Sequence, residues 1–230
     1  MLTATFTLEG IGAALRLLSS FAFCVAWQQS DLFWHLGLNR HARTGALLQK
    51  IGLANMLSGL RGLCAAYLLA RLIGGLATSP VLVLFVFLTG IASDILDGQV
   101  ARLTHTQSRL GQIMDGETDF CLYLAMTIIL IQDHILALWI GIAMLLRFVV
   151  PLLAALVSYF LFARPVSFGS TLLGKYAWLA QCLYILLLLA PARLAFVTHI
   201  VDLPLLLVML GLLIAAPLAQ ILVNRPAYSG

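Results

Sequence analysis

Long apolar runs dominate the sequence and restrict its fold more than any other feature. Hydrophobic residues make up 62% of the 230 positions and charged residues only 10%, whereas a soluble domain carries about 25% charged residues to cover its surface. A helix that crosses a bilayer needs about 20 mainly apolar residues, and runs of this length recur along the chain. The sequence therefore predicts an integral membrane protein.

Six of these runs follow residue 50, and short polar links containing Pro80, Asp133 or Pro191 separate several of them. This pattern predicts an all-α fold, with a six-transmembrane-helix bundle over residues 51–225 and a short tail at 226–230. The runs lie near residues 53–73, 81–101, 113–132, 135–162, 172–189 and 203–223.

Residues 1–50 differ in character from the rest. Their apolar run, near residues 11–27, is interrupted by Arg16 and has no basic segment before it, which argues against a cleaved signal peptide. The stretch 28–50 mixes aromatic, histidine and arginine residues. This composition favours an interfacial, juxtamembrane helical segment, with a seventh span as the alternative.

The basic residues gather on one side of the predicted bundle. The formal net charge is +4, but its basic residues are spread between apolar runs, which indicates membrane topology and contact with lipid headgroups rather than nucleic-acid binding. We expect a multi-pass protein of the bacterial inner membrane with both ends of the core in the cytoplasm. The residues on that side are Arg40, Arg43, Lys50, Arg102, Arg109, Arg164, Lys175 and Arg225.

Acidic residues concentrate in one short segment, because five of the nine lie between Asp94 and Asp119. Side chains three or four positions apart share a helix face, so Asp94 pairs with Asp97, and Asp115 with Asp119. Two antiparallel helices can bring both pairs together, and such a group requires a cation. Oxygen ligands without His or Cys select Mg²⁺, Mn²⁺ or Ca²⁺, and two such ions suit phosphoryl transfer. Glu117 is expected to face away from this group.

Small and basic residues accompany the aspartates. Gly98 and Gly111 let a bulky ligand approach the backbone, and Arg102 offers several donors to phosphate oxygens. Upstream, Asn55, Ser58 and Arg61 would lie along one end of the first core helix. The acidic segment reads Asp94-x2-Asp97-Gly98-x2-Ala101-Arg102-x8-Gly111-x3-Asp115-x3-Asp119.

This segment resembles the signature of the CDP-alcohol phosphatidyltransferase family at every defined position. The resemblance implies an enzyme that transfers a phosphoalcohol group from a CDP-alcohol to an alcohol and releases CMP. It implies that Asp94, Asp97 and Asp115 hold two Mg²⁺ or Mn²⁺ ions. Asp119 would be the general base and a further metal ligand.

The resemblance also implies binding residues for both substrates. Basic residues on later helices bind acceptors that carry a phosphate in some members, which makes Arg147, Arg164 and Lys175 candidates here. Phe148 stands where those enzymes often have an acid, so the acceptor stays open. The implied donor-binding residues are Asn55, Ser58, Arg61, Gly98, Ala101, Arg102, Ser108 and Gly111.

The expected donor is CDP-diacylglycerol, and the expected acceptor is a small polar alcohol such as glycerol phosphate, inositol, inositol phosphate or serine. The reverse arrangement, with a soluble CDP-amino-alcohol and diacylglycerol, stays open, and the family resemblance suggests a homodimer. Two other classes are alternatives. Intramembrane carboxylates also mark ion-coupled transporters, and aspartate-rich prenyltransferases also bind a diphosphate through Mg²⁺, although they usually lack the Asp-Gly-x2-Ala-Arg core.

Overall fold

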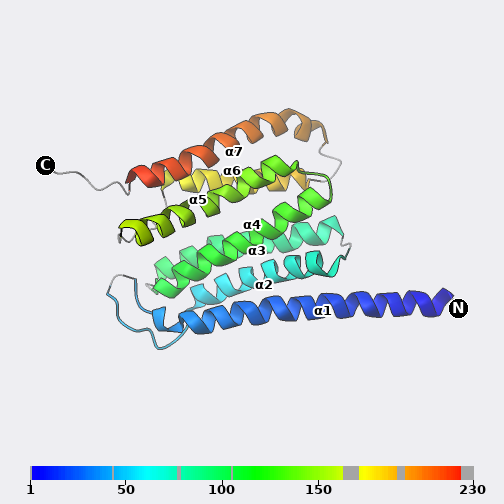
Figure 1. Cartoon of the computed structure of the whole chain (residues 1–230), viewed down its shortest axis with the longest axis horizontal. Coiled ribbons are helices and arrows are strands. Elements are labelled where there is room, and N and C mark those ends of the chain that lie inside the picture. The colour runs from blue at the N-terminus through cyan, green and yellow to red at the C-terminus, as the bar shows by residue number, and fades with distance from the viewer. Residues whose placement is uncertain are drawn as a thin grey trace. The chain divides into compact units, whose positions relative to one another are not determined.

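The computed structural model describes residues 2–42, 44–76, 79–104, 106–162, 171–190 and 195–223. Within these ranges the chain forms seven α-helices and one short 3-10 helix, with no strand beyond two isolated β-bridges. The predicted all-α fold is therefore confirmed. The elements in chain order (Figure 1) are α1 (Leu2–His35), η1 (Leu36–Leu38), α2 (Leu53–Gly74), α3 (Pro80–Leu103), α4 (Arg109–Gln132), α5 (Leu138–Phe162), α6 (Leu172–Leu188) and α7 (Ala195–Val223).

Local signals fix several helix ends. Gly75 ends α2 in the left-handed conformation (φ 63°), and its N–H bonds back to the last turn, as is common for glycine after a helix. Pro80 begins α3, where a proline costs no intrahelical hydrogen bond. Thr171 caps α6 by accepting a hydrogen bond from the Gly174 N–H (3.0 Å), which satisfies one of the free donors of that first turn.

The apolar helices suit a multi-pass membrane protein. Four helices of the described ranges are long and apolar enough to cross a membrane, and two further apolar helices are shorter. The predicted count of six spans therefore stays a prediction. The four candidates are Gly10–Leu38, Leu53–Gly74, Pro80–Leu103 and Ile200–Ala219, and the shorter helices are Leu138–Leu153 and Leu172–Leu188.

The N-terminal segment forms one continuous helix as far as His35. Arg16 does not interrupt it, and its apolar part, Gly10–Leu38, is long enough to cross a membrane. Large apolar side chains such as Leu18 and Phe23 are exposed along it. The seventh span that we named as the alternative to an interfacial segment thus agrees with its length and composition. The placement of residues 1–50 at the interface stays a prediction.

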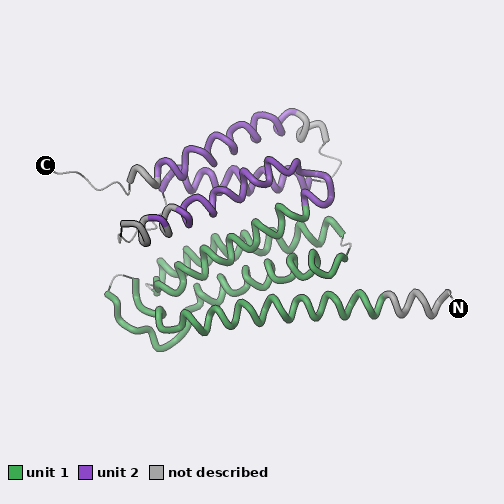
Figure 2. The backbone as a smooth tube through the Cα atoms, viewed as in Figure 1, with its two compact units in different colours: residues 1–129 green, residues 130–230 purple. Residues whose placement is uncertain are grey.

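The chain divides into two compact units, residues 1–129 and residues 130–230 (Figure 2). In the first unit α2 packs against both α1 and α3. Ala65 and Ala66 are fully buried in α2, and such small side chains allow close helix packing. On α3, a Cβ atom at Gly90 would lie 2.7 Å from Leu122 Cδ2 of α4, so the glycine lets these two helices approach.

The second unit contains α5, α6 and α7, and α7 packs against both of the others. Its described core includes Met144, Ile185 and Met209, whose side chains are fully buried. The six-helix region that the sequence predicts, residues 51–225, begins in the first unit and continues into the second.

Candidate active site

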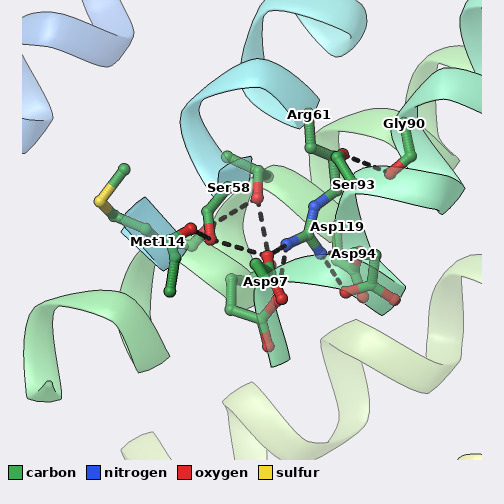
Figure 3. A network of polar contacts seen from close by, with 11 residues as sticks. Ser58, Arg61, Gly90, Ser93, Asp94, Asp97, Met114 and Asp119 are labelled. Atoms are coloured by element: carbon green, nitrogen blue, oxygen red, sulfur yellow. Dashed lines mark hydrogen bonds and ion pairs between the residues drawn. The ribbon is translucent and has the colours of Figure 1, made fainter. Parts of the chain in front are cut away.

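The candidate active site lies at one end of the first unit, where α3 ends and where α2 and α4 begin. This arrangement places the start of α2, the Asp94–Asp97 pair and the Asp115–Asp119 pair in one small region. Arg61 of α2 lies at its centre. Figure 3 shows the Arg61 guanidinium pointing into a group that includes Asp94, Asp97 and Asp119.

Arg61 forms an ion pair with each of the four motif aspartates. Its Nη1 atom donates to Asp94 Oδ1 (2.6 Å) and to Asp119 Oδ1 (2.5 Å). Its Nη2 atom donates to Asp115 Oδ1 (2.8 Å) and to Asp97 Oδ2. The Arg61 side chain is fully buried. A guanidinium has donors on several sides, and one side chain can therefore hold carboxylates from two helices together.

The carboxylate oxygens have the spacing and chemistry of a cation site. One oxygen each of Asp94, Asp97 and Asp115 lies within 4.8 Å of the other two. Ser58 Oγ donates to Asp97 Oδ2 (2.8 Å), which orients that carboxylate. Hard oxygen donors of this kind suit Mg²⁺ or Mn²⁺.

The charge balance also favours a cation. Four carboxylates face one guanidinium, which would leave three negative charges in excess with all four ionised. Like charges repel each other strongly at these distances when they are shielded from bulk water. The Asp115 side chain is 51% exposed, whereas that of Asp97 is only 9% exposed. The group of Asp94, Asp97 and Asp115 therefore extends from the protein interior to an accessible edge. The residues present therefore fit divalent metal ions.

A cavity of about 210 Å³ adjoins the aspartates, and Asp97 and Asp115 form part of its wall. All but one of the predicted donor-binding residues line this cavity. The exception is Arg61, which lies among the aspartates instead. The lining residues that the sequence singled out are Asn55, Ser58, Gly98, Ala101, Arg102, Ser108 and Gly111.

Gly111 allows α2 and α4 to meet beside the cavity. A Cβ atom there would lie 2.6 Å from Asn55 Oδ1 and 3.2 Å from Ser108 Oγ. Ser108 Oγ accepts hydrogen bonds from the Gly111 N–H (2.9 Å) and from Asn55 Nδ2 (3.3 Å). Ser108 thus caps the first turn of α4, a structural role that the sequence analysis did not assign to it.

Further lining residues escaped the sequence analysis, namely Ala54, Thr106, Gln107 and Gln112. Each lies within two positions of a predicted residue, so adjacency along the chain is the signal that could have found them. Glu117 is exposed and lies with Asp31 and His35 of α1, with one ligand atom of each within 4.8 Å of the others. It is not one of the clustered metal candidates Asp94, Asp97 and Asp115.

The predicted acceptor residues belong to the second unit. Arg147 Nη1 donates to Gln181 Oε1 (3.2 Å), and its guanidinium lies 5.0 Å from the centre of the Phe148 ring. These contacts supply the polar partner that an arginine inside an apolar helix requires. Lys175 is exposed in the first turn of α6, and Arg164 lies outside the described residues. Their acceptor roles stay predictions.

Fold and site together define a helical membrane protein with clustered carboxylates that fit divalent metal ions beside a cavity. A family model for CDP-alcohol phosphatidyltransferases matches residues 51–216, and the chain belongs to this family. Its members transfer a phosphoalcohol group from a CDP-alcohol to an alcohol and are generally metal-dependent. No curated protein and no solved structure matches the chain.

Removal of the Arg61 charge should destabilise the metal-free protein. Arg61→Met would leave four clustered carboxylates without their counter-charge, and loss of one partner of a buried ion pair costs about 3–5 kcal/mol. We expect a lower melting temperature for the purified variant in EDTA and partial recovery with Mn²⁺. Arg16→Met, at an exposed position of α1, is the control. Equal melting temperatures for the two variants in EDTA would contradict the central role of Arg61.

Enlargement of Gly111 should impair donor binding. Gly111→Val would push into Asn55 and Ser108, and overpacking of this kind costs about 1–3 kcal/mol. We expect the KM for the CDP-alcohol to rise by at least about fivefold. Gly116→Val on the same helix is the matched control, because a Cβ atom there meets nothing within 4 Å. Similar donor KM values for both variants would show that Gly111 is not needed for the shape of the cavity.

Proposed function

We propose that the protein transfers a phosphatidyl group from CDP-diacylglycerol to a small polar alcohol and releases CMP. The observation that carries this proposal is the group of four aspartates around Arg61, beside a cavity lined by the glycines, alanine and arginine of the same motif. An ion-coupled transporter would also place carboxylates at membrane depth. It would have no need for the small residues and Arg102 around a diphosphate-sized ligand.

Asp94, Asp97 and Asp115 are the proposed ligands of two Mg²⁺ or Mn²⁺ ions. Such ions, when bound, neutralise diphosphate oxygens and make CMP a competent leaving group. Ser58 supports this role, because its hydroxyl holds the buried Asp97 carboxylate in one orientation. The partly exposed Asp115 lies on the cavity wall, where a cation that accompanies the donor would enter.

The cavity is the proposed site of the cytidine diphosphate. Arg102 lies in its wall and supplies a positive charge for phosphate oxygens, which guanidinium groups bind through several donors. The N-terminal end of α4 also forms part of this wall, through Ser108, Gly111 and Gln112. The first turn of a helix favours anionic groups, so both features attract a diphosphate.

Asp119 is the proposed general base. Its carboxylate would take the proton of the acceptor hydroxyl while that oxygen attacks the phosphorus that carries the alcohol. The bond between this phosphorus and the CMP oxygen then breaks, and CMP leaves with the electron pair. A carboxylate is a weak base, so the rate depends on positioning of the acceptor. The hydrogen bond from Arg61 Nη1 orients the Asp119 carboxylate, which supports a fixed position of the base relative to the acceptor.

Apolar side chains around the site support a lipid substrate. Leu103 directly follows Arg102 and is 80% exposed, and Ile95 and Leu96 of the same helix are also exposed. A diacylglycerol chain could therefore stay in the bilayer while its headgroup reaches the cavity. This observation suits CDP-diacylglycerol as the donor and equally suits diacylglycerol as the acceptor of a soluble CDP-amino-alcohol. The positive-inside bias supports a cytoplasmic orientation of the site.

A panel assay separates these alternatives. Purified protein would receive CDP-diacylglycerol and Mg²⁺ or Mn²⁺ with glycerol phosphate, inositol, inositol phosphate or serine in separate reactions, and the CMP and lipid products would be separated by chromatography. We expect one acceptor to be strongly preferred, and preference for a phosphate-bearing one would support roles for Arg147 and Lys175. A CDP-amino-alcohol with diacylglycerol tests the reverse arrangement. No CMP from any pair would refute the proposal.

Loss of one proposed metal ligand should nearly abolish turnover without unfolding the protein. Asp97→Asn keeps the side-chain shape but removes the charge, and we expect CMP release to fall by about 100-fold or more, because metal coordination contributes several kcal/mol. Mn²⁺ binding, followed by calorimetry, should weaken in parallel. Asp133→Asn, an exposed change beyond the last residue of α4, is the control. Turnover of Asp97→Asn close to that of the control would reject the metal-ligand assignment.

A further inference from the structure

In the connector between α1 and α2, the described residues 36–42 and 44–52 form hydrogen bonds with one another. Asn39 is buried, and its Nδ2 atom donates to the carbonyl oxygens of Leu48 (3.0 Å) and Lys50 (3.2 Å). The Leu48 N–H returns a hydrogen bond to the Asn39 carbonyl (2.8 Å), and the His41 N–H bonds to the Ala46 carbonyl (2.8 Å). The Asn39 side chain thus closes the connector into a compact turn.

Two backbone hydrogen bonds join this connector to the chain at the start of α4. The Ala42 N–H donates to the Gln107 carbonyl (2.8 Å), and the Arg109 N–H donates to the Arg40 carbonyl (3.0 Å). Arg109 is the first residue of α4, and its N–H has no partner within the helix. The connector therefore satisfies a helix-end donor while it fixes the backbone on both sides of Ser108.

The chain that the connector holds is a wall of the proposed donor site. Gln107 and Ser108 both line the cavity, and Ser108 is buried. Ser108 Oγ in turn accepts from the Gly111 N–H and from Asn55. A shift of the 107–109 backbone would therefore move the residues on two sides of the cavity.

Helix α1 reinforces the same region. Gln28 Nε2 donates to the Gly62 carbonyl (2.9 Å), next to Arg61. A Cβ atom at Gly62 would lie 2.9 Å from Gln28 Oε1, so a larger residue there would displace the Gln28 side chain. Asp31 and His35 lie beside Glu117, which falls between Asp115 and Asp119 in the sequence. These contacts keep the end of α1, and hence the connector, in place against α2 and α4.

We infer that the connector is a positioning element for the CDP-alcohol, although it lies almost wholly outside the family match that begins at residue 51. Residues 40–42 act through their backbone on residues 107–109 and do not themselves line the cavity. This inference rests on the proposed function, because it assigns the cavity to the donor. It gives the N-terminal segment a role in substrate affinity beyond membrane attachment.

Two full-length variants test this role. Ala42→Pro removes the N–H that binds the Gln107 carbonyl, and Asn39→Asp replaces two donated hydrogen bonds within the connector by unfavourable contacts between oxygens. We expect the donor KM to rise about threefold to tenfold in each, the range for loss of one or two hydrogen bonds, with an unchanged acceptor KM. Hydrogen exchange of the Arg109 amide, followed by mass spectrometry of the peptide around it, should become faster.

Matched variants separate positioning from general damage. Ala42→Ser keeps the N–H, and Gln49→Glu makes the same charge change as Asn39→Asp at an exposed position of the connector. Both should keep the wild-type donor KM. Three outcomes would overturn the inference. The first is a donor KM of Ala42→Pro within about twofold of that of Ala42→Ser. The others are a rise in both the donor and the acceptor KM, and a fall in kcat with both KM values unchanged. Should Ala42→Pro fail to fold, Asn39→Asp against Gln49→Glu decides by the same criteria.

The exchange measurement also separates this inference from the proposed function. Wild-type protein that releases no CMP from any CDP-alcohol would refute the proposed function and, with it, the donor role of the connector. Faster exchange at Arg109 in Ala42→Pro would then still show that the connector holds the start of α4. Unchanged exchange in an active enzyme would overturn the connector's contact itself.

Discussion

The ion pairs between Arg61 and four aspartates determine how three helices meet. Asp94 and Asp97 come from α3 and Asp115 and Asp119 from α4, and without a shared cation these pairs would repel each other. Arg61 brings the counter-charge from α2, in a fully buried position. Because one positive charge cannot balance four negative ones, the same arrangement that joins the helices leaves an attraction for further cations. Helix packing and proposed chemistry thus depend on one cluster.

The requirement for close approach explains the small residues around that cluster. The donors of a guanidinium reach carboxylates on two helices only if the helices are close, and side chains at Gly62, Gly90 or Gly111 would separate them. Gly111 allows α4 to approach Asn55, and its N–H donates to the Ser108 hydroxyl. Gly111 of the motif is therefore explained by packing as well as by the space that a nucleotide needs.

Local periodicity made much of this predictable, and long-range contacts made the rest unpredictable. The spacing of Asp94, Asp97, Asp115 and Asp119 assigns each pair to one helix face. The family resemblance as a whole, with Asn55, Ser58 and Ser108 added to the signature, names most residues of the cavity wall. The position of Arg61 was not predictable, because a long flexible side chain near the start of α2 could equally have faced the donor. The hydrogen bonds between residues 40–42 and 107–109 involve only backbone atoms, so no pattern of side chains in the sequence predicts them. Apolar composition likewise could not decide between a span and an interfacial helix for α1.

The N-terminal contacts are the basis for the inferred influence of residues 1–50 on a site to which they contribute no residue. Each contact lies next to a residue of proposed function: Gly62 beside Arg61, Glu117 between Asp115 and Asp119, and Gln107 beside Ser108. A displacement of α1 would therefore reach the counter-charge, the second aspartate pair and the donor cavity at once. On the inferred positioning role, the segment before residue 51 could change donor affinity while the motif stays unchanged. The bonds between residues 40–42 and 107–109 join backbone atoms only, so they leave the side chains of these residues free to vary.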